Sequence, residues 1–131
     1  KLFSKIDAFI SGSEDPGMFW IYSRVAQGVS VEEAEKAVWA ELEELKRELV
    51  PEEELCKVRN RFESEHIFRN IGGENLSNNI ALAHLRGNLD SHFKEPELYS
   101  AVTAEQLRLA AKELFRKGNS NVLYYLKRAE E

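Results

Sequence analysis

Residues 28–38 read GVSVEEAEKAV, and the pattern of the chain changes from strand to helix within them. Gly28 ends an alternating segment. Ser30 and Glu33 then have the spacing of a capping box, in which the serine caps the first turn and the glutamate reaches back to it. From Val31 onward, apolar residues recur at steps of three and four, which is typical of one buried helix face. This stripe consists of Val31, Ala34, Val38, Leu42, Leu45 and Leu49.

Upstream of Gly28 the apolar pattern has a period of two. Alternate residues from Leu2 to Ile10 fall on one side of a predicted strand, and Met18–Val25 forms a second strand rich in aromatic residues. Residues 11–17 between them are dense in turn-forming types. The sequence therefore predicts a β-hairpin over residues 1–27.

Downstream, the helical pattern continues over about residues 30–117. Pro51 ends the first predicted helix and opens a second, and a capping box at Thr103 and Gln106 opens the last. Pro96 predicts a loop at residues 90–99. The remaining expectations are a second helix to about Asn70, a third over about Glu74–Asn88, and a closing strand at about residues 121–127.

This order of elements predicts an α+β fold, with an antiparallel sheet and helices layered on one face. Three strands make a narrow sheet for so much helix. We therefore expect residues 1–131 to be a single domain that is incomplete at its N-terminus, with further strands preceding Lys1.

Composition excludes several classes of protein. The chain has 131 residues and a net charge of −5, with its basic residues dispersed among acidic ones, which argues against nucleic-acid binding. No apolar run approaches the ~20 residues of a membrane span. No signal peptide is visible, so the compartment stays unknown. Cys56 is the only cysteine, and its apolar neighbours predict a small buried helix residue.

Residues 61–68, RFESEHIF, resemble a zinc-binding motif. In H-x-x-E-H, two histidines one turn apart bind zinc and the glutamate activates water. Here Phe62 replaces the first histidine and offers no lone pair, while Glu63, Glu65 and His66 remain. His84 and His92 lie elsewhere in the sequence, and we expect both to be isolated. We therefore predict no metal ligand and no catalytic residue, and place His66 at the edge of a packed helix face.

The same helix also contains Glu63-x-x-His66, which is half of a di-iron signature, but the chain has no second copy. Gly72-Gly73 lacks the lysine of a phosphate loop. Trp20, Tyr22 and Arg24 alternate on one strand face. They either line a peptide cleft or pack against neighbouring strands, and the pattern favours packing. No substrate-binding residue is identified.

The succession of several stretches resembles a known family. These stretches are Asp15-Pro16-Gly17-Met18-Phe19, Gly28–Ala34, Val50-Pro51-Glu52-Glu53-Glu54-Leu55, Val102–Leu107 and Asn121-Val122-Leu123-Tyr124-Tyr125. They are similar to the non-catalytic, C-terminal type of domain in the pitrilysin/insulinase family of zinc peptidases. That family of inverzincins includes mitochondrial processing peptidase and the core subunits of respiratory complex III. The resemblance covers nearly the whole chain and implies a metalloprotease-like α/β sandwich.

The resemblance implies that zinc and the catalytic glutamate belong to a separate, homologous domain, in the same chain or in a partner subunit. Glu63 and Glu65 then lie near the position of a third zinc ligand, but the two histidines that would complete a zinc site are missing. Such domains can hold substrate through a tyrosine, where this chain has Phe3 and Ser4. The implied function is to close a chamber around an unfolded peptide substrate. The alternatives are a purely structural role in assembly and an autonomous metalloenzyme using Glu63, Glu65 and His66.

Overall fold

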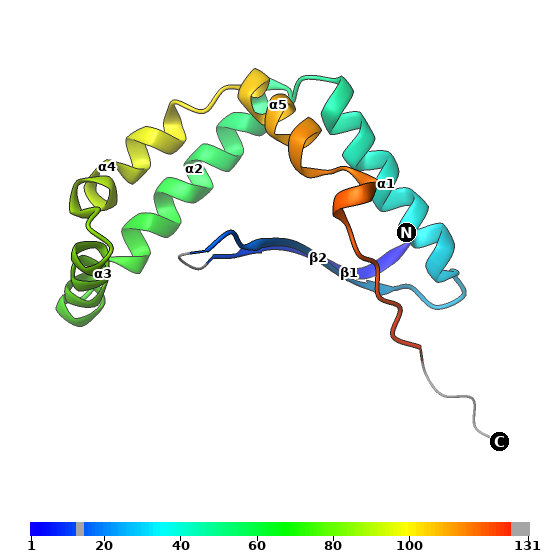
Figure 1. Cartoon of the computed structure of the whole chain (residues 1–131), viewed down its shortest axis with the longest axis horizontal. Helices are drawn as coiled ribbons and strands as arrows, with labels where there is room; N and C mark the ends of the chain where they lie inside the picture. The colour runs from blue at the N-terminus through cyan, green and yellow to red at the C-terminus, as the bar shows by residue number, and fades with distance from the viewer. Residues whose placement is uncertain (13–14, 127–131) are drawn as a thin grey trace. The chain divides into compact units, whose positions relative to one another are not determined.

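The structure, a computed structural model, describes residues 1–12 and 15–126, except for the side chain of Ser91. The chain forms two compact units, one of residues 1–44 with the segment from residue 117 onward, and one of residues 45–116. Figure 1 labels the main elements, which are β1 (Phe3–Ser11), β2 (Met18–Val25), α1 (Val31–Arg47), α2 (Glu52–Arg69), α3 (Gly73–Leu85), α4 (Leu89–Ser100) and α5 (Ala104–Leu114). A short 3₁₀ helix, η1 (Lys117–Asn119), follows α5.

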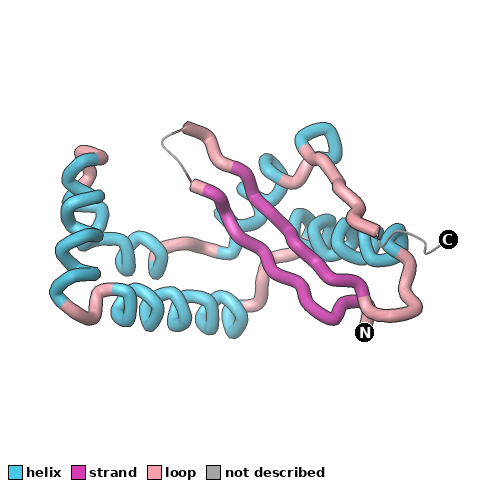
Figure 2. The backbone as a smooth tube through the Cα atoms, turned by 90° about the horizontal axis from the view of Figure 1, so that it is seen from below, coloured by secondary structure: helices cyan, strands magenta, loops and turns pink. Residues whose placement is uncertain are grey.

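Strands β1 and β2 form the predicted hairpin in the first unit (Figure 2). They pair antiparallel, with Ala8 opposite Ile21, and the register is interrupted by a bulge between Phe3 and Lys5. Gly17 lies so close to β1 that an added Cβ would come within 1.9 Å of the Ser11 carbonyl oxygen. The return of the chain therefore requires glycine at this position.

The two faces of the hairpin differ in character because side chains alternate along each strand. One face is apolar and carries Ile6, Ala8, Ile10, Phe19 and Ile21. The opposite face mixes aromatic and charged side chains, namely Lys5, Asp7, Phe9, Trp20, Tyr22 and Arg24. Ile10 on the apolar face is 70% exposed, so the described residues leave much of that face uncovered.

Helix α1 begins as the sequence predicts. Gly28 has φ of +84°, a conformation that favours glycine, and it turns the chain out of β2. The Ser30 hydroxyl accepts a hydrogen bond of 3.2 Å from the backbone N–H of Glu33. Acidic residues in the first turn and Lys46 and Arg47 in the last turn complement the helix dipole. Ala34, on the predicted apolar stripe, is buried.

The second unit is helical, and α4 packs against both α2 and α3. The expectation of a loop at residues 90–99 is wrong, because α4 covers this segment and contains Pro96. Proline removes one helical N–H donor and disfavours a helix interior. Packing against two neighbouring helices stabilises α4 in spite of that cost, because helices in proteins depend more on tertiary contacts than on intrinsic propensity.

Helix α5 begins with the predicted capping box. The Thr103 hydroxyl accepts from the Gln106 backbone N–H at 3.2 Å, and the Gln106 side chain accepts from the Thr103 N–H at 2.8 Å. Arg59 of α2 donates to the carbonyl oxygen of Val102 at 2.6 Å, and so connects α2 to the start of α5.

The closing strand expected at residues 121–127 does not form over residues 121–126, and residue 127 lies outside the described residues. A strand needs backbone partners for its N–H and C=O groups, and the described sheet contains only β1 and β2. The expected third strand of the sheet is therefore corrected. The α+β class with an antiparallel sheet is confirmed.

Candidate functional site

The helix face that carries the zinc-like motif is packed against α4. Phe62 of α2 stacks on Tyr99 with ring centroids 3.5 Å apart and the planes 9° from parallel. The Phe62 and His66 rings, one turn apart on α2, are 6.3 Å apart. His66 therefore lies on a packed face, as predicted, and Phe62 occupies an aromatic stack where the motif would need an imidazole.

The His66 ring contacts two side chains of α4. Its Nδ1 lies 3.1 Å from Glu95 Oε2, and its side chain is only 14% exposed. Its ring centroid is 5.6 Å from that of His92. The sequence treats His92 as isolated, and this is wrong, because the non-local packing of α4 on α2 brings the two imidazoles together. Because the sequence predicts a loop at residues 90–99, it does not predict the contact between His66 and His92.

The two glutamates of the motif do not converge on His66. Glu65 accepts a 2.7 Å hydrogen bond from Arg61 Nε, one turn earlier on the exposed side of α2. This bond raises the pKa of the Arg61 guanidinium. Glu63 is exposed. Among residues 1–12 and 15–126, no group of three or more His, Cys, Asp or Glu side chains could hold a metal ion.

Cys56 is exposed, which corrects the expectation of a buried thiol. Its neighbour Leu55 is buried, and consecutive residues on a helix point about 100° apart, so Cys56 turns away from the covered stripe. The Asn60 side chain donates to its sulfur at 3.7 Å.

His84 is exposed at the end of α3, beside a shallow hollow lined with Asn88 and Asp90.

The aromatic residues of β2 pack against side chains on β1, as the pattern favoured. The Trp20 ring stacks on Phe9 with centroids 6.3 Å apart, and its indole N–H donates to the Ser11 hydroxyl at 3.0 Å. On the same face, Lys5 and Asp7 form an ion pair at 2.7 Å, which raises the pKa of Lys5. The mixed face of the hairpin is therefore organised by contacts within the hairpin itself, one set between the strands and one along β1.

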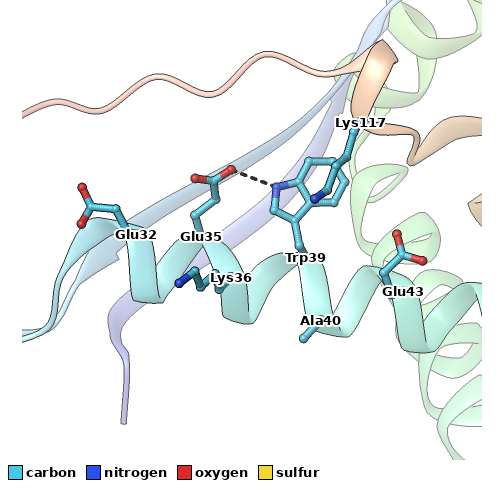
Figure 3. Close-up of a pocket in the computed structure, with 7 residues that line it drawn as sticks. All are labelled: Glu32, Glu35, Lys36, Trp39, Ala40, Glu43 and Lys117. Carbon is cyan, nitrogen blue, oxygen red and sulfur yellow. Dashed lines mark hydrogen bonds between the residues drawn. The ribbon is translucent and has the colours of Figure 1, made fainter.

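Sequence reasoning missed a cleft beside Trp39 on α1, which Figure 3 shows in close-up. The cleft has a volume of about 640 Å³ and lies within the first unit. It is lined by Glu32, Glu35, Lys36, Trp39, Ala40, Glu43 and Lys117. A signal existed in the sequence, because Trp39 lies off the apolar stripe of its helix and has a glutamate one turn before it and another one turn after it.

Both carboxylate oxygens of Glu35 in this cleft accept hydrogen bonds. One of its oxygens accepts from the Trp39 indole N–H at 3.0 Å, and the other accepts from the Tyr124 hydroxyl. The bond from Tyr124, followed by the bond from Trp39, lowers the pKa of Glu35. The same contact with Glu35 raises the pKa of the Tyr124 phenol. Glu35 is therefore held as an anion and Tyr124 as a neutral donor.

The fold described above is that of an α+β domain with an antiparallel hairpin followed by helices. Residues 1–62 match the family described as "Peptidase M16 inactive domain". Over these residues the chain is therefore similar to the non-catalytic domains of the M16 peptidases. The resemblance drawn from the sequence is confirmed.

A solved structure described as "The crystal structure of a protease from Helicobacter pylori" is similar to this chain, with a TM-score of 0.81. The sequence identity is 18%, so this similarity shows the fold alone. The alignment covers 90% of this chain and 28% of that protease chain, so the present chain spans about a quarter of its length. A comparison with curated proteins gives no match. Of the helices that the structure describes, none is both long and apolar enough to cross a membrane.

Proposed function

We propose that residues 1–131 form the later part of a catalytically silent domain of an M16 metallopeptidase, which packs against a homologous zinc-bearing domain. In this function the domain closes the chamber and helps to accommodate a peptide substrate. The match of residues 1–62 to the M16 inactive domain carries the proposal. The zinc-bearing domain belongs to the same parent chain or to a partner subunit.

The residues that the structure describes do not fit a zinc site of their own. Phe62 has no lone pair and stacks on Tyr99, while Glu65 is bonded to Arg61. His66 Nδ1 is engaged with Glu95. The peptidases of this family use zinc to activate water, and under the proposal that chemistry is supplied entirely by the zinc-bearing domain. The present chain contributes surface and supplies no catalytic residue and no metal ligand.

Exposed apolar surface supports a packing function. Among the described residues only Ala34, Leu55 and Ala111 are buried hydrophobics. In the first unit Ile6 and Ile10 on the apolar face of the hairpin are 49% and 70% exposed. Extended apolar surface of this kind marks a site that another part of a protein covers.

The test uses this chain and the zinc-bearing domain of its parent, produced separately and then mixed. We expect the chain alone to bind no stoichiometric zinc and to cleave no peptide. The mixture is expected to form a complex that hydrolyses a fluorogenic peptide, with loss of activity on chelation and recovery on adding zinc. A stable complex with no hydrolysis would replace the proposal with a purely structural role. Hydrolysis by this chain alone that is lost on chelation would refute it.

Two matched variants test which hairpin face packs. Ile10→Asn changes the apolar face, and Asp7→Asn introduces the same residue on the opposite face. Burying an isoleucine side chain contributes about 1.5–3 kcal/mol, so Ile10→Asn is expected to weaken association about 10- to 100-fold. Asp7→Asn is expected to change it less than about threefold. Equal effects of the two variants would exclude the apolar face as the packing surface.

A further inference from the structure

The Trp39 cleft already contains a cation supplied by the chain itself. The Lys117 ammonium lies over the Trp39 ring, 5.9 Å from its centroid. This distance is within the range in which the negative face of an aromatic ring attracts a positive charge. Figure 3 shows Lys117 against the indole while Lys36 leaves the helix lower down, apart from the ring.

The surroundings of the indole favour a positive charge. Three glutamates and two lysines line the cleft, so its net charge is negative. Glu32, Glu35 and Glu43 project on the same side of α1 as the indole (Figure 3). The indole N–H donates to Glu35 at 3.0 Å, and a hydrogen bond to an anion increases the electron density of the ring that faces the cation.

The tryptophan and the carboxylate are held in place before any ligand arrives. Glu35 and Trp39 are one helical turn apart and hydrogen-bonded, and Glu35 also accepts from Tyr124. Trp39 is half-buried, so part of its side chain is covered by the protein. A preorganised ring and anion reduce the entropy lost on binding.

We propose that the Trp39 cleft is a binding site for a cationic side chain of a peptide, with arginine as the best fit, and that Lys117 is an internal occupant that the ligand displaces. Arginine suits the site because its planar guanidinium stacks on an aromatic ring while its N–H groups reach a carboxylate. The cleft is open to solvent, so a side chain of a peptide can reach the indole from the surface. This inference rests on the geometry of the first unit and does not depend on the proposed peptidase function.

The experiment titrates the 131-residue chain with N-acetyl-Gly-Arg-Gly-amide and, as a neutral control, with N-acetyl-Gly-Gln-Gly-amide. The chain has two tryptophans, so its NMR spectrum contains two indole N–H signals, and loss of one in Trp39→Phe assigns them. We expect the arginine peptide to shift the Trp39 signal saturably and to leave the Trp20 signal unchanged. The glutamine peptide is expected to shift neither signal. Absence of a saturable shift with the arginine peptide would overturn the proposal.

A pair of lysine variants separates displacement from simple charge attraction. Lys117→Gln and Lys36→Gln remove the same charge from the lining, but only Lys117→Gln vacates the indole. We expect the affinity for the arginine peptide to rise about 2- to 5-fold more in Lys117→Gln than in Lys36→Gln, which is the size of an exposed cation–π contact. Glu35→Gln, as a second variant, is expected to weaken binding. Equal affinities of the two lysine variants would show attraction by net charge alone and would refute displacement.

Discussion

Arg59 connects two helices of the second unit, and its replacement is expected to destabilise that unit measurably. Its Nη2 donates to the Val102 carbonyl oxygen at 2.6 Å, and its Nη1 lies 2.8 Å from Glu52 Oε1. The Arg59 side chain is 25% exposed, whereas that of Glu52 is 75% exposed. A hydrogen bond from a charged donor contributes about 1.5–3 kcal/mol, while an exposed ion pair contributes at most about 1 kcal/mol.

Arg59→Met keeps the apolar, unbranched stem of the side chain and removes the donors, so we expect a loss of about 1.5–3 kcal/mol in the free energy of unfolding. Glu52→Gln removes only the exposed ion pair and is expected to cost less than about 1 kcal/mol. Urea unfolding followed by helical circular dichroism measures both values. Hydrogen exchange at the first amides of α5 is expected to accelerate in Arg59→Met alone. If the two variants lose equal stability, the contact with Val102 does not hold α5 in place.

Three further predictions concern the other contacts described above. Because the pKa of Glu35 is lowered, its bond with Tyr124 stabilises the fold above the ordinary glutamate pKa of 4.5 and is lost as pH falls through the lowered value. Because the pKa of Tyr124 is raised, the same bond stabilises the fold below pH 10.0 and is lost as pH rises through the raised pKa of the folded state. The difference in the free energy of unfolding between wild type and Tyr124→Phe should therefore vanish at both extremes of pH. A difference that stays constant with pH would contradict the bond between Glu35 and Tyr124. Thr103→Ala removes the cap of α5 and should cost about 1 kcal/mol in urea unfolding, with Thr103→Ser as the control that retains stability. Phe62→His restores the letters of H-x-x-E-H but also breaks the aromatic stack, so we expect lower thermal stability and no stoichiometric zinc by metal analysis; tight zinc binding shared with His66 would refute the view that this face is committed to packing.

Some parts of this protein follow from local sequence alone. The hairpin follows from alternation and turn residues, α1 and α5 follow from the 3.6-residue period and their terminal signals, and α2 follows mainly from Pro51 and the acidic residues of its first turn. Capping at Ser30 and Thr103 involves groups only three residues apart, so no distant partner is needed to predict it. Phenylalanine has no lone pair with which to bind a metal, so the residue type at position 62 is enough to predict that this ligand is missing.

Tertiary structure decided the features that depend on residues far apart in the chain. Helix α4 forms around Pro96 because α2 and α3 pack against it, and this packing brings His92 to His66. Residues 121–126 have a strand-like composition, but strand formation requires a neighbour that composition does not supply. The Trp39 cleft depends on Lys117, and the position of Glu35 depends on Tyr124; these residues follow their partners on α1 by 78 and 89 positions in the sequence. Local periodicity predicts a helix and its apolar face, whereas long-range packing determines which other element contacts that face.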